Sequence, residues 1–127
     1  MDTLLGGAGE DVLYTGSGAG GRAEGGSGDD TYVVDAANTT IVEAAGGGND
    51  TVRTSVTLEL AATSEVEMIR VADQSTATNI DLRGSDTDNQ LRGNEGDNTL
   101  DGRGGADRMV GLGGDDTYIV DNAGDIV

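Results

Sequence analysis

The feature that most constrains the fold of this chain is a nonapeptide that repeats without a gap over residues 84–119. Each copy has Gly in its first position, and three of the four have Gly in the fourth. The sixth position holds Asn or Asp, and the eighth holds Leu, Met or Tyr. The four copies read GSDTDNQLR, GNEGDNTLD, GRGGADRMV and GLGGDDTYI. Because four positions keep their spacing throughout, the fold must be one that adds a similar unit with every copy.

A second, less regular array occupies residues 1–35. GGAGEDVLY (6–14) and GGSGDDTYV (25–33) are full copies of the pattern. Between them, residues 15–24 form a broken copy, with Arg22 where the apolar residue is expected. The sequence therefore predicts two repeat arrays, over 1–35 and 75–121, joined by a segment without nonapeptides.

A longer period is superimposed on the short one. The heptapeptide DDTYVVD (29–35) returns as DDTYIVD (115–121). We therefore expect the chain to hold about one and a half units of a larger tandem. Residues 122–127 would be the start of a truncated next unit, and the whole would be part of a longer tandem-repeat chain.

The composition excludes several classes of protein. The chain has no Cys and no His, which excludes disulfide frameworks, thiolate or zinc sites of the usual kind, and Ser-His-Asp catalysis. No apolar run is long enough to span a membrane. Acidic residues number 24 against 7 arginines, and the net charge of −17 repels nucleic acid. Such a chain suits cations as partners.

The nonapeptides resemble the glycine- and aspartate-rich repeats of the repeats-in-toxin (RTX) family, Gly-Gly-x-Gly-x-Asp-x-apolar-x. The chain departs from that pattern at Asn89 and Asn98, in the broken copy, and across residues 36–74. The resemblance implies an all-β fold, a right-handed parallel β-roll or β-solenoid with several Ca²⁺ ions bound in its turns. It also implies a secreted, extracellular bacterial protein exported by type I secretion.

The physics of one repeat is consistent with that fold. Glycines permit a tight turn in the first part of each copy, and the rest forms a short strand whose middle side chain points inward. Consecutive repeats then lie in opposite sheets, so that two nonapeptides complete one coil. Stacked turns bring carboxylates together, and a divalent cation would neutralise them. Ca²⁺ accepts six to eight oxygens with loose geometry, whereas Mg²⁺ demands a stricter octahedron.

The coil of two nonapeptides predicts individual metal sites. Turns on the same edge of the roll are one coil apart, so their sixth-position side chains should flank one ion. The predicted pairs are Asp11 with Asp30, Asn89 with Asp107, and Asn98 with Asp116. By analogy with the family, backbone oxygens would complete the shells near Gly7, Gly9, Gly26, Gly28, Gly96, Gly105 and Gly114. The pairs that contain Asn carry one negative charge less and are expected to bind more weakly. Ordinary solvated turns are the alternative.

The middle segment, residues 36–74, is predicted to continue the solenoid with wider coils. β-branched and alternating residues indicate strands at 40–42, 51–53, 57–60 and 66–71. Asp50 occupies the sixth position of a turn-like stretch and is a candidate ligand, with a plain Asx turn as the alternative. A helix around 59–70 is a second possibility, although it lacks a clear cap or apolar stripe.

These observations predict a calcium-binding, non-catalytic β-roll module that folds on calcium binding after export. The alternative is a polysaccharide-binding or surface-binding module on the same scaffold, as in modules similar to those of bacterial alginate epimerases or adhesins. Arg53, Arg83 and Arg92 take the outward ninth position and are candidates to contact an acidic polysaccharide. Solvated surface arginines are the alternative for these three residues.

Overall fold

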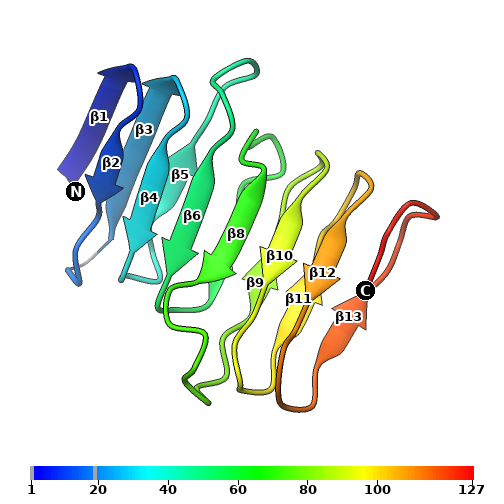
Figure 1. The fold of residues 1–127 in the computed structure, drawn as a ribbon. Helices are drawn as coiled ribbons and strands as arrows, with labels where there is room; N and C mark the ends of the chain where they lie inside the picture. Colours follow the sequence, from blue (N-terminus) through cyan, green and yellow to red (C-terminus); the bar gives the residue numbers. More distant parts are fainter. Residues whose placement is uncertain (1, 19) are drawn as a thin grey trace.

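Short strands and glycine turns alternate along the whole chain in the computed structural model, which describes residues 2–18 and 20–127. The chain forms a parallel β-solenoid with two layers of strands (Figure 1). Of the described residues, none belongs to a helix long and apolar enough to cross a membrane. Residues 59–70 hold the end of β7, turns and most of β8, so the alternative of a helix there is wrong.

One layer is a continuous sheet of six parallel strands, which we call the long sheet. Its strands are β2 (Val12–Tyr14), β4 (Thr31–Val34), β6 (Thr51–Thr54), β8 (Met68–Val71), β10 (Gln90–Arg92) and β12 (Arg108–Val110). These strands neighbour one another in that order, so each coil of the solenoid adds one strand.

The opposite layer is divided into two short sheets (Figure 1). The N-terminal short sheet holds β1 (Asp2–Ala8), β3 (Gly21–Ser27) and β5 (Thr40–Val42). The C-terminal short sheet holds β7 (Leu58–Glu59), β9 (Leu82–Arg83), β11 (Thr99–Asp101) and β13 (Thr117–Ile119). Within the described residues, the hydrogen-bonded ladder of this layer is interrupted between β5 and β7.

Strand pairing confirms the predicted coil. Leu82 pairs with Leu100, and Leu100 pairs with Tyr118, each two nonapeptides further along the chain. In the middle segment Thr51 pairs with Thr31 before it and with Met68 after it. The first of these coils is longer than two nonapeptides and the second is slightly shorter. The solenoid therefore continues through residues 36–74, with coils of unequal length rather than uniformly wider ones, because turns of different length connect strands that keep their order.

The broken copy is accommodated by one extra residue, which places Ala23 rather than Arg22 at the buried position. Leu4 pairs with Ala23, one residue further along than two nonapeptides would place its partner, and Ala23 pairs with Ile41. Ala23 is fully buried, whereas Arg22 is exposed and forms an ion pair with Glu24. The extra residue shifts the alternation of side chains by one position, so that Ala23 points into the core in place of Arg22.

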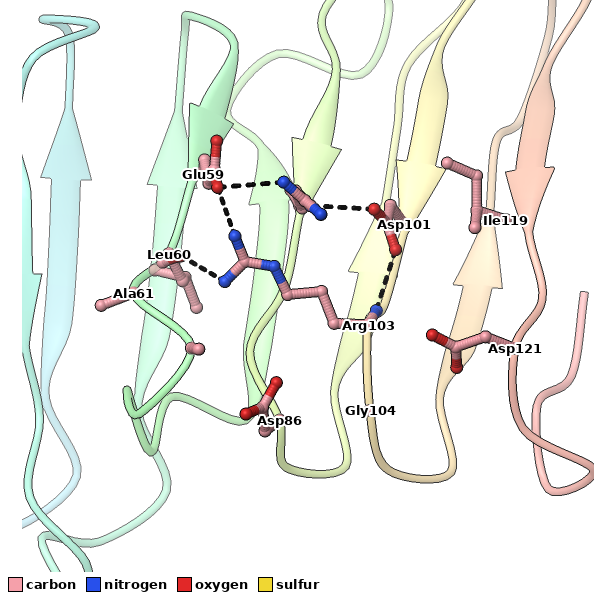
Figure 2. Close-up of a pocket in the computed structure, with 11 residues that line it drawn as sticks. Glu59, Leu60, Ala61, Asp86, Asp101, Arg103, Gly104, Ile119 and Asp121 are labelled. Atoms are coloured by element: carbon pink, nitrogen blue, oxygen red, sulfur yellow. Dashed lines mark hydrogen bonds and ion pairs between the residues drawn. The ribbon is translucent and has the colours of Figure 1, made fainter.

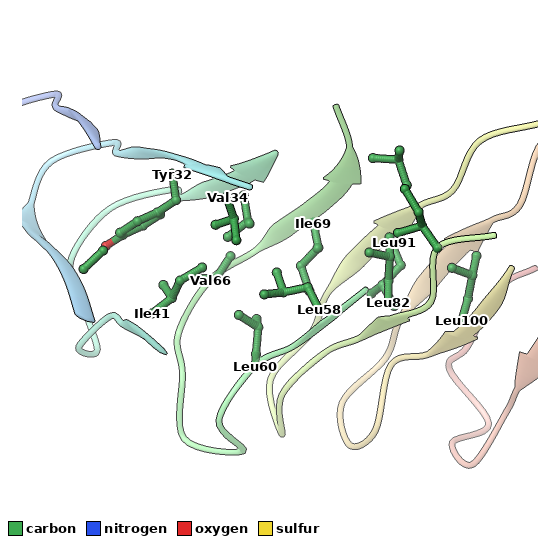
Figure 3. Close-up of a cluster of buried hydrophobic side chains, with 14 of the residues drawn as sticks. Tyr32, Val34, Ile41, Leu58, Leu60, Val66, Ile69, Leu82, Leu91 and Leu100 are labelled. Atoms are coloured by element: carbon green, nitrogen blue, oxygen red, sulfur yellow. The ribbon is translucent and has the colours of Figure 1, made fainter. Parts of the chain in front are cut away.

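The core is a single file of apolar side chains between the two layers (Figure 3). The long sheet contributes its middle residues: Leu13, Tyr32, Val52, Ile69, Leu91 and Met109. The short sheets contribute Ala23, Ile41, Leu58, Leu82 and Leu100. Each coil buries only a few such residues, so the apolar contribution per coil is small compared with the backbone entropy that folding removes.

Candidate metal centre

The turns that lead into the long sheet stack their sixth-position side chains along one edge. Each carboxylate after that of Asp11 accepts a hydrogen bond from the backbone N–H one coil earlier. The N–H of Asp11 donates to Oδ1 of Asp30 at 2.8 Å, and that of Asp30 donates to Oδ1 of Asp50 at 2.8 Å. The N–H of Asp50 donates to Oε2 of Glu67 at 2.6 Å. We call Asp11, Asp30, Asp50 and Glu67 the acid ladder.

The same arrangement recurs in the second array. The N–H of Asn89 donates to Oδ1 of Asp107 at 2.8 Å, and that of Asp107 donates to Oδ1 of Asp125 at 3.0 Å. On the other edge, the N–H of Asn98 donates to Oδ1 of Asp116 at 3.0 Å. The structure thus brings together all three predicted pairs, Asp11 with Asp30, Asn89 with Asp107 and Asn98 with Asp116. Their role as metal ligands stays a prediction.

One oxygen of each of several carboxylates has no partner. Oδ2 of Asp11, Asp30 and Asp107 and Oε2 of Glu43 are buried and accept no hydrogen bond within the described structure. A buried carboxylate oxygen without a donor is costly unless a cation or a proton neutralises it. These oxygens are free to act as metal ligands, and their burial fits a cation at the turns.

The acids gather most closely at three buried side chains, Asp30, Glu43 and Asp50, which we call the three-carboxylate centre. One carboxylate oxygen of each lies within 4.8 Å of the other two. The side chains come from turns on neighbouring coils, and only 1–4% of each residue is exposed. No cation of the protein lies within ion-pair distance of the three carboxylates in the described residues.

Tyr32 and Gly25 hold the Glu43 carboxylate in place. The Tyr32 hydroxyl donates to Oε1 of Glu43, and the N–H of Gly25 donates to the Tyr32 hydroxyl at 2.6 Å and to Oε1 of Glu43 at 3.0 Å. Glu43 directs its second oxygen toward the turn of the next coil, near Gly47. One oxygen is therefore fixed by the protein and the other is left for a ligand.

Burial raises the pKa values of three groups at these turns, Asp50, Tyr32 and Asp107. It raises the pKa of Asp50 to about 7, with further contributions from the charges of Glu43 and Glu67, against the lowering effect of the Asp30 N–H. Burial likewise raises the pKa of the Tyr32 hydroxyl, which also donates to Glu43, and that of Asp107. The centre therefore holds its full negative charge poorly, and a divalent cation would relieve the repulsion.

Glycine is required where the turns touch the carboxylates and each other. A Cβ on Gly25 would overlap the Asp30 and Glu43 carboxylates, and one on Gly26 (φ 111°) would overlap the Gly7 carbonyl. Of the predicted backbone ligands, Gly7, Gly9, Gly26, Gly28, Gly105 and Gly114 have positive φ, whereas Gly96 does not. The turns therefore stack with their backbones in close contact, at a separation that only glycine permits.

Asn89 and Asn98 differ from the acids because the oxygen and the nitrogen of each side-chain amide already form hydrogen bonds within the protein. Nδ2 of Asn89 donates to the Val66 carbonyl at 2.7 Å, and its Oδ1 accepts from the N–H of Ser85 at 2.7 Å. Nδ2 of Asn98 donates to the Ile80 carbonyl at 2.7 Å, and its Oδ1 accepts from the N–H of Asn94 at 3.0 Å. An ion at these turns would displace existing bonds, which supports the prediction of weaker binding there.

Replacing Asn89 by Asp is expected to make its turn dependent on calcium. The variant loses the amide that donates to Val66 and places a second acid beside Asp107. In chelator its free energy of unfolding should fall by about 1–3 kcal/mol, whereas calcium should restore the loss. Urea unfolding in chelator and in calcium measures both effects. Asn38→Asp, at an exposed position, is the matched control, and equal losses in the two variants would contradict the assignment.

Comparison with known proteins yields one family. The model of the RTX calcium-binding nonapeptide repeat matches residues 2–20, 22–41 and 83–118, with four copies. The chain belongs to the RTX family. The family consists of calcium-binding repeats that form β-rolls, and such repeats are typical of secreted bacterial proteins. No curated protein and no solved structure matches the chain.

The RTX match does not include all of the clustered acids. Glu43, Asp50 and Glu67 lie between the matched segments, and Asp125 follows the last of them. Sequence reasoning selected Asp50 but missed the other three. The coil spacing is the signal that indicates them, since Glu43 lies one coil after Gly25 and Asp125 lies one coil after Asp107.

A hollow on the outer face of the C-terminal short sheet is lined by two arginines that form ion pairs with acidic side chains (Figure 2). Glu59 accepts from both Arg83 and Arg103, and Arg83 Nε also donates to Asp101 at 2.9 Å. Arg103 donates to the Leu60 carbonyl at 3.0 Å as well. These contacts tie neighbouring coils together, so we assign the hollow a structural role.

Proposed function

We propose that this chain is a calcium-dependent folding module, which stays unfolded at low calcium and folds on binding several Ca²⁺ ions outside the cell. The observation that carries the proposal is the three-carboxylate centre with its unpartnered oxygens. Three acids buried together oppose folding when they are uncompensated and favour it when a cation joins them. The module performs no reaction, and its function is to change from the unfolded to the folded state when calcium binds.

The donor set favours Ca²⁺ over other metals. The candidate ligands are carboxylates and turn carbonyls, and the sequence contains neither Cys nor His. Asp30, Glu43 and Asp50 would hold one ion, and the Asp11–Asp30 pair would hold another. Asn89 with Asp107, and Asn98 with Asp116, would flank weaker sites. Extracellular calcium modules bind with Kd of about 10⁻⁴–10⁻³ M, which is the range we expect.

The net charge and the small core explain why folding would wait for calcium. A charge of −17 on 127 residues opposes compaction. The row of buried apolar side chains contributes too little free energy to offset this repulsion. In the calcium-poor cytosol the chain would stay extended, which suits passage through a narrow type I exporter. Outside the cell, calcium binding to the folded state alone shifts the equilibrium by mass action.

Far-UV circular dichroism during a calcium titration tests this function. We expect a cooperative gain of β signal between about 10⁻⁴ and 10⁻³ M Ca²⁺, and no comparable gain with Mg²⁺ at the same concentrations. Full β structure in chelator would contradict the proposal, because the roll would then be stable through packing and hydrogen bonds alone.

A further inference from the structure

Arginines gather on one face of a strongly acidic protein. Arg53, Arg70 and Arg92 lie on the adjacent strands β6, β8 and β10, and strand pairing places Arg53 opposite Arg70 and Arg70 opposite Arg92. Arg108 lies on the next strand, β12, one row away. The outer face of the long sheet thus carries four of the seven arginines of the chain. We call Arg53, Arg70 and Arg92 the arginine row.

The strands of this face carry no acidic residue among their outward positions. One outward row reads Val12, Thr31, Thr51, Met68, Gln90 and Arg108 along the solenoid. The other reads Tyr14, Val33, Arg53, Arg70, Arg92 and Val110. In a chain with 24 acidic residues, the charged side chains at the outward positions of these strands are therefore all positive.

The arginines of this face have no partner within the described part of the protein. The described ion pairs belong to Arg22, Arg83 and Arg103, all outside the long sheet. Moreover, Nε of Arg53 and Nε of Arg70 are buried against the sheet and make no hydrogen bond in the described structure. This state differs from that of Arg83 and Arg103, whose guanidinium groups are bonded to carboxylates (Figure 2). The arginine row is therefore available to an external anion.

We propose that the arginine row binds a linear polysaccharide with a carboxylate on each sugar, a function beyond calcium-dependent folding. Adjacent strands are about 4.8 Å apart, so the three guanidinium groups repeat at about the length of one sugar residue. A guanidinium group binds a carboxylate through two parallel hydrogen bonds. A groove that includes Arg70 and Arg92 of the row is also lined by Met68, Gln90, Leu91, Arg108 and Val110. The polymer would run along the solenoid axis, across the strands.

The same face is poorly suited to other ligands. Neutral sugars and unpaired bases bind by stacking on aromatic rings, and the only aromatic residue in the two outward rows is Tyr14, at the far end of the sheet. Arg83, which its outward ninth position made a candidate to contact an acidic polysaccharide, lies on β9 in the other layer and does not belong to this surface.

Isothermal titration with a short oligogalacturonate, in calcium and at low salt, tests the proposal. We expect binding that weakens as salt rises, and a loss of affinity of about tenfold or more in Arg70→Gln. Arg22→Gln, which removes the same charge from an exposed position on the N-terminal short sheet, should change the affinity by less than about twofold. Circular dichroism in the same buffer reports whether each variant is folded. If Arg70→Gln does not fold, Arg92→Gln serves at an exposed position of the same row.

Several outcomes would overturn the proposal. These are absence of binding by the folded protein, equal loss in Arg70→Gln and Arg22→Gln, or equal binding of an uncharged oligosaccharide of the same length. Tighter binding of single-stranded DNA would assign the face to nucleic acid. Self-association in sedimentation that Arg70→Gln abolishes, without oligogalacturonate binding, would assign it to the acidic surface of a second copy.

Discussion

Replacing Glu43 by Gln is expected to remove one Ca²⁺ ion from the binding stoichiometry of the module. Gln keeps an oxygen that can accept from Gly25 and Tyr32, but its amide nitrogen replaces the free oxygen of the three-carboxylate centre. At a calcium concentration near one hundred times Kd, a lost ion reduces the stabilisation by calcium by about 2.7 kcal/mol. Titration calorimetry gives the stoichiometry, and urea unfolding over a series of calcium concentrations gives the stabilisation.

The variant also has an expected effect of opposite sign in chelator. Removing one of three buried negative charges lowers the repulsion with Asp30 and Asp50, so the calcium-free fold should gain stability. Glu95→Gln, at an exposed position in the turn before β11, changes the charge equally and is the control. An unchanged ion count in Glu43→Gln, or an equal change in Glu95→Gln, would show that Glu43 is not a ligand.

Acid is expected to replace calcium in part. The pKa of Asp50 in the calcium-free fold is about 7, above its usual value of 3.8. Between these two values the folded state binds the proton more readily than the unfolded state, so stability rises as the pH falls. A raised pKa of this size contributes on the order of 3 kcal/mol between about pH 7.5 and pH 4.5. Asp107, whose pKa is also raised by burial, acts in the same direction.

Far-UV circular dichroism in chelator across this pH range measures the effect. The β signal should increase as the pH falls through 7, before calcium is added. Asp50→Asn, which is neutral at every pH, should show a clearly shallower dependence and more β signal near neutral pH. If the wild-type protein loses β signal on acidification, or if both proteins follow the same curve, the assignment of Asp50 as a buried, unneutralised acid is wrong.

Much of the fold could be predicted because the length of the repeat determines the length of one coil and which strands pair. The coil of two nonapeptides follows from the repeat alone, and the pairing of Leu82, Leu100 and Tyr118 confirms it. Strands in the middle segment were indicated by β-branched residues, and β5, β6, β7 and β8 lie at the predicted places. Within the acid ladder, the pair of Asp11 and Asp30 was indicated in the same way, whereas Glu67 was missed.

The remaining features depend on coil length, which a nonapeptide pattern does not specify outside the arrays. One added residue exchanged Arg22 for Ala23 in the core. Coils of unequal length aligned Arg70 with Arg53 and Arg92, although no short motif connects these residues. The repeat pattern also did not indicate that the side-chain amides of Asn89 and Asn98 donate hydrogen bonds to backbone carbonyls of an earlier coil.

The division of one layer into two short sheets has a consequence for cooperativity. Each coil of a solenoid contacts mainly its neighbours, so such a protein unfolds as a one-dimensional array in which the weakest junction sets the boundaries of the unfolding units. In the described residues, the coils that hold β5 and β7 are joined by hydrogen bonds of the long sheet and by the Asp50–Glu67 hydrogen bond, without a ladder in the opposite layer. This junction divides the array into two blocks that can open separately. Amide hydrogen exchange at limiting calcium should then show two protection levels, with the change located between β5 and β7.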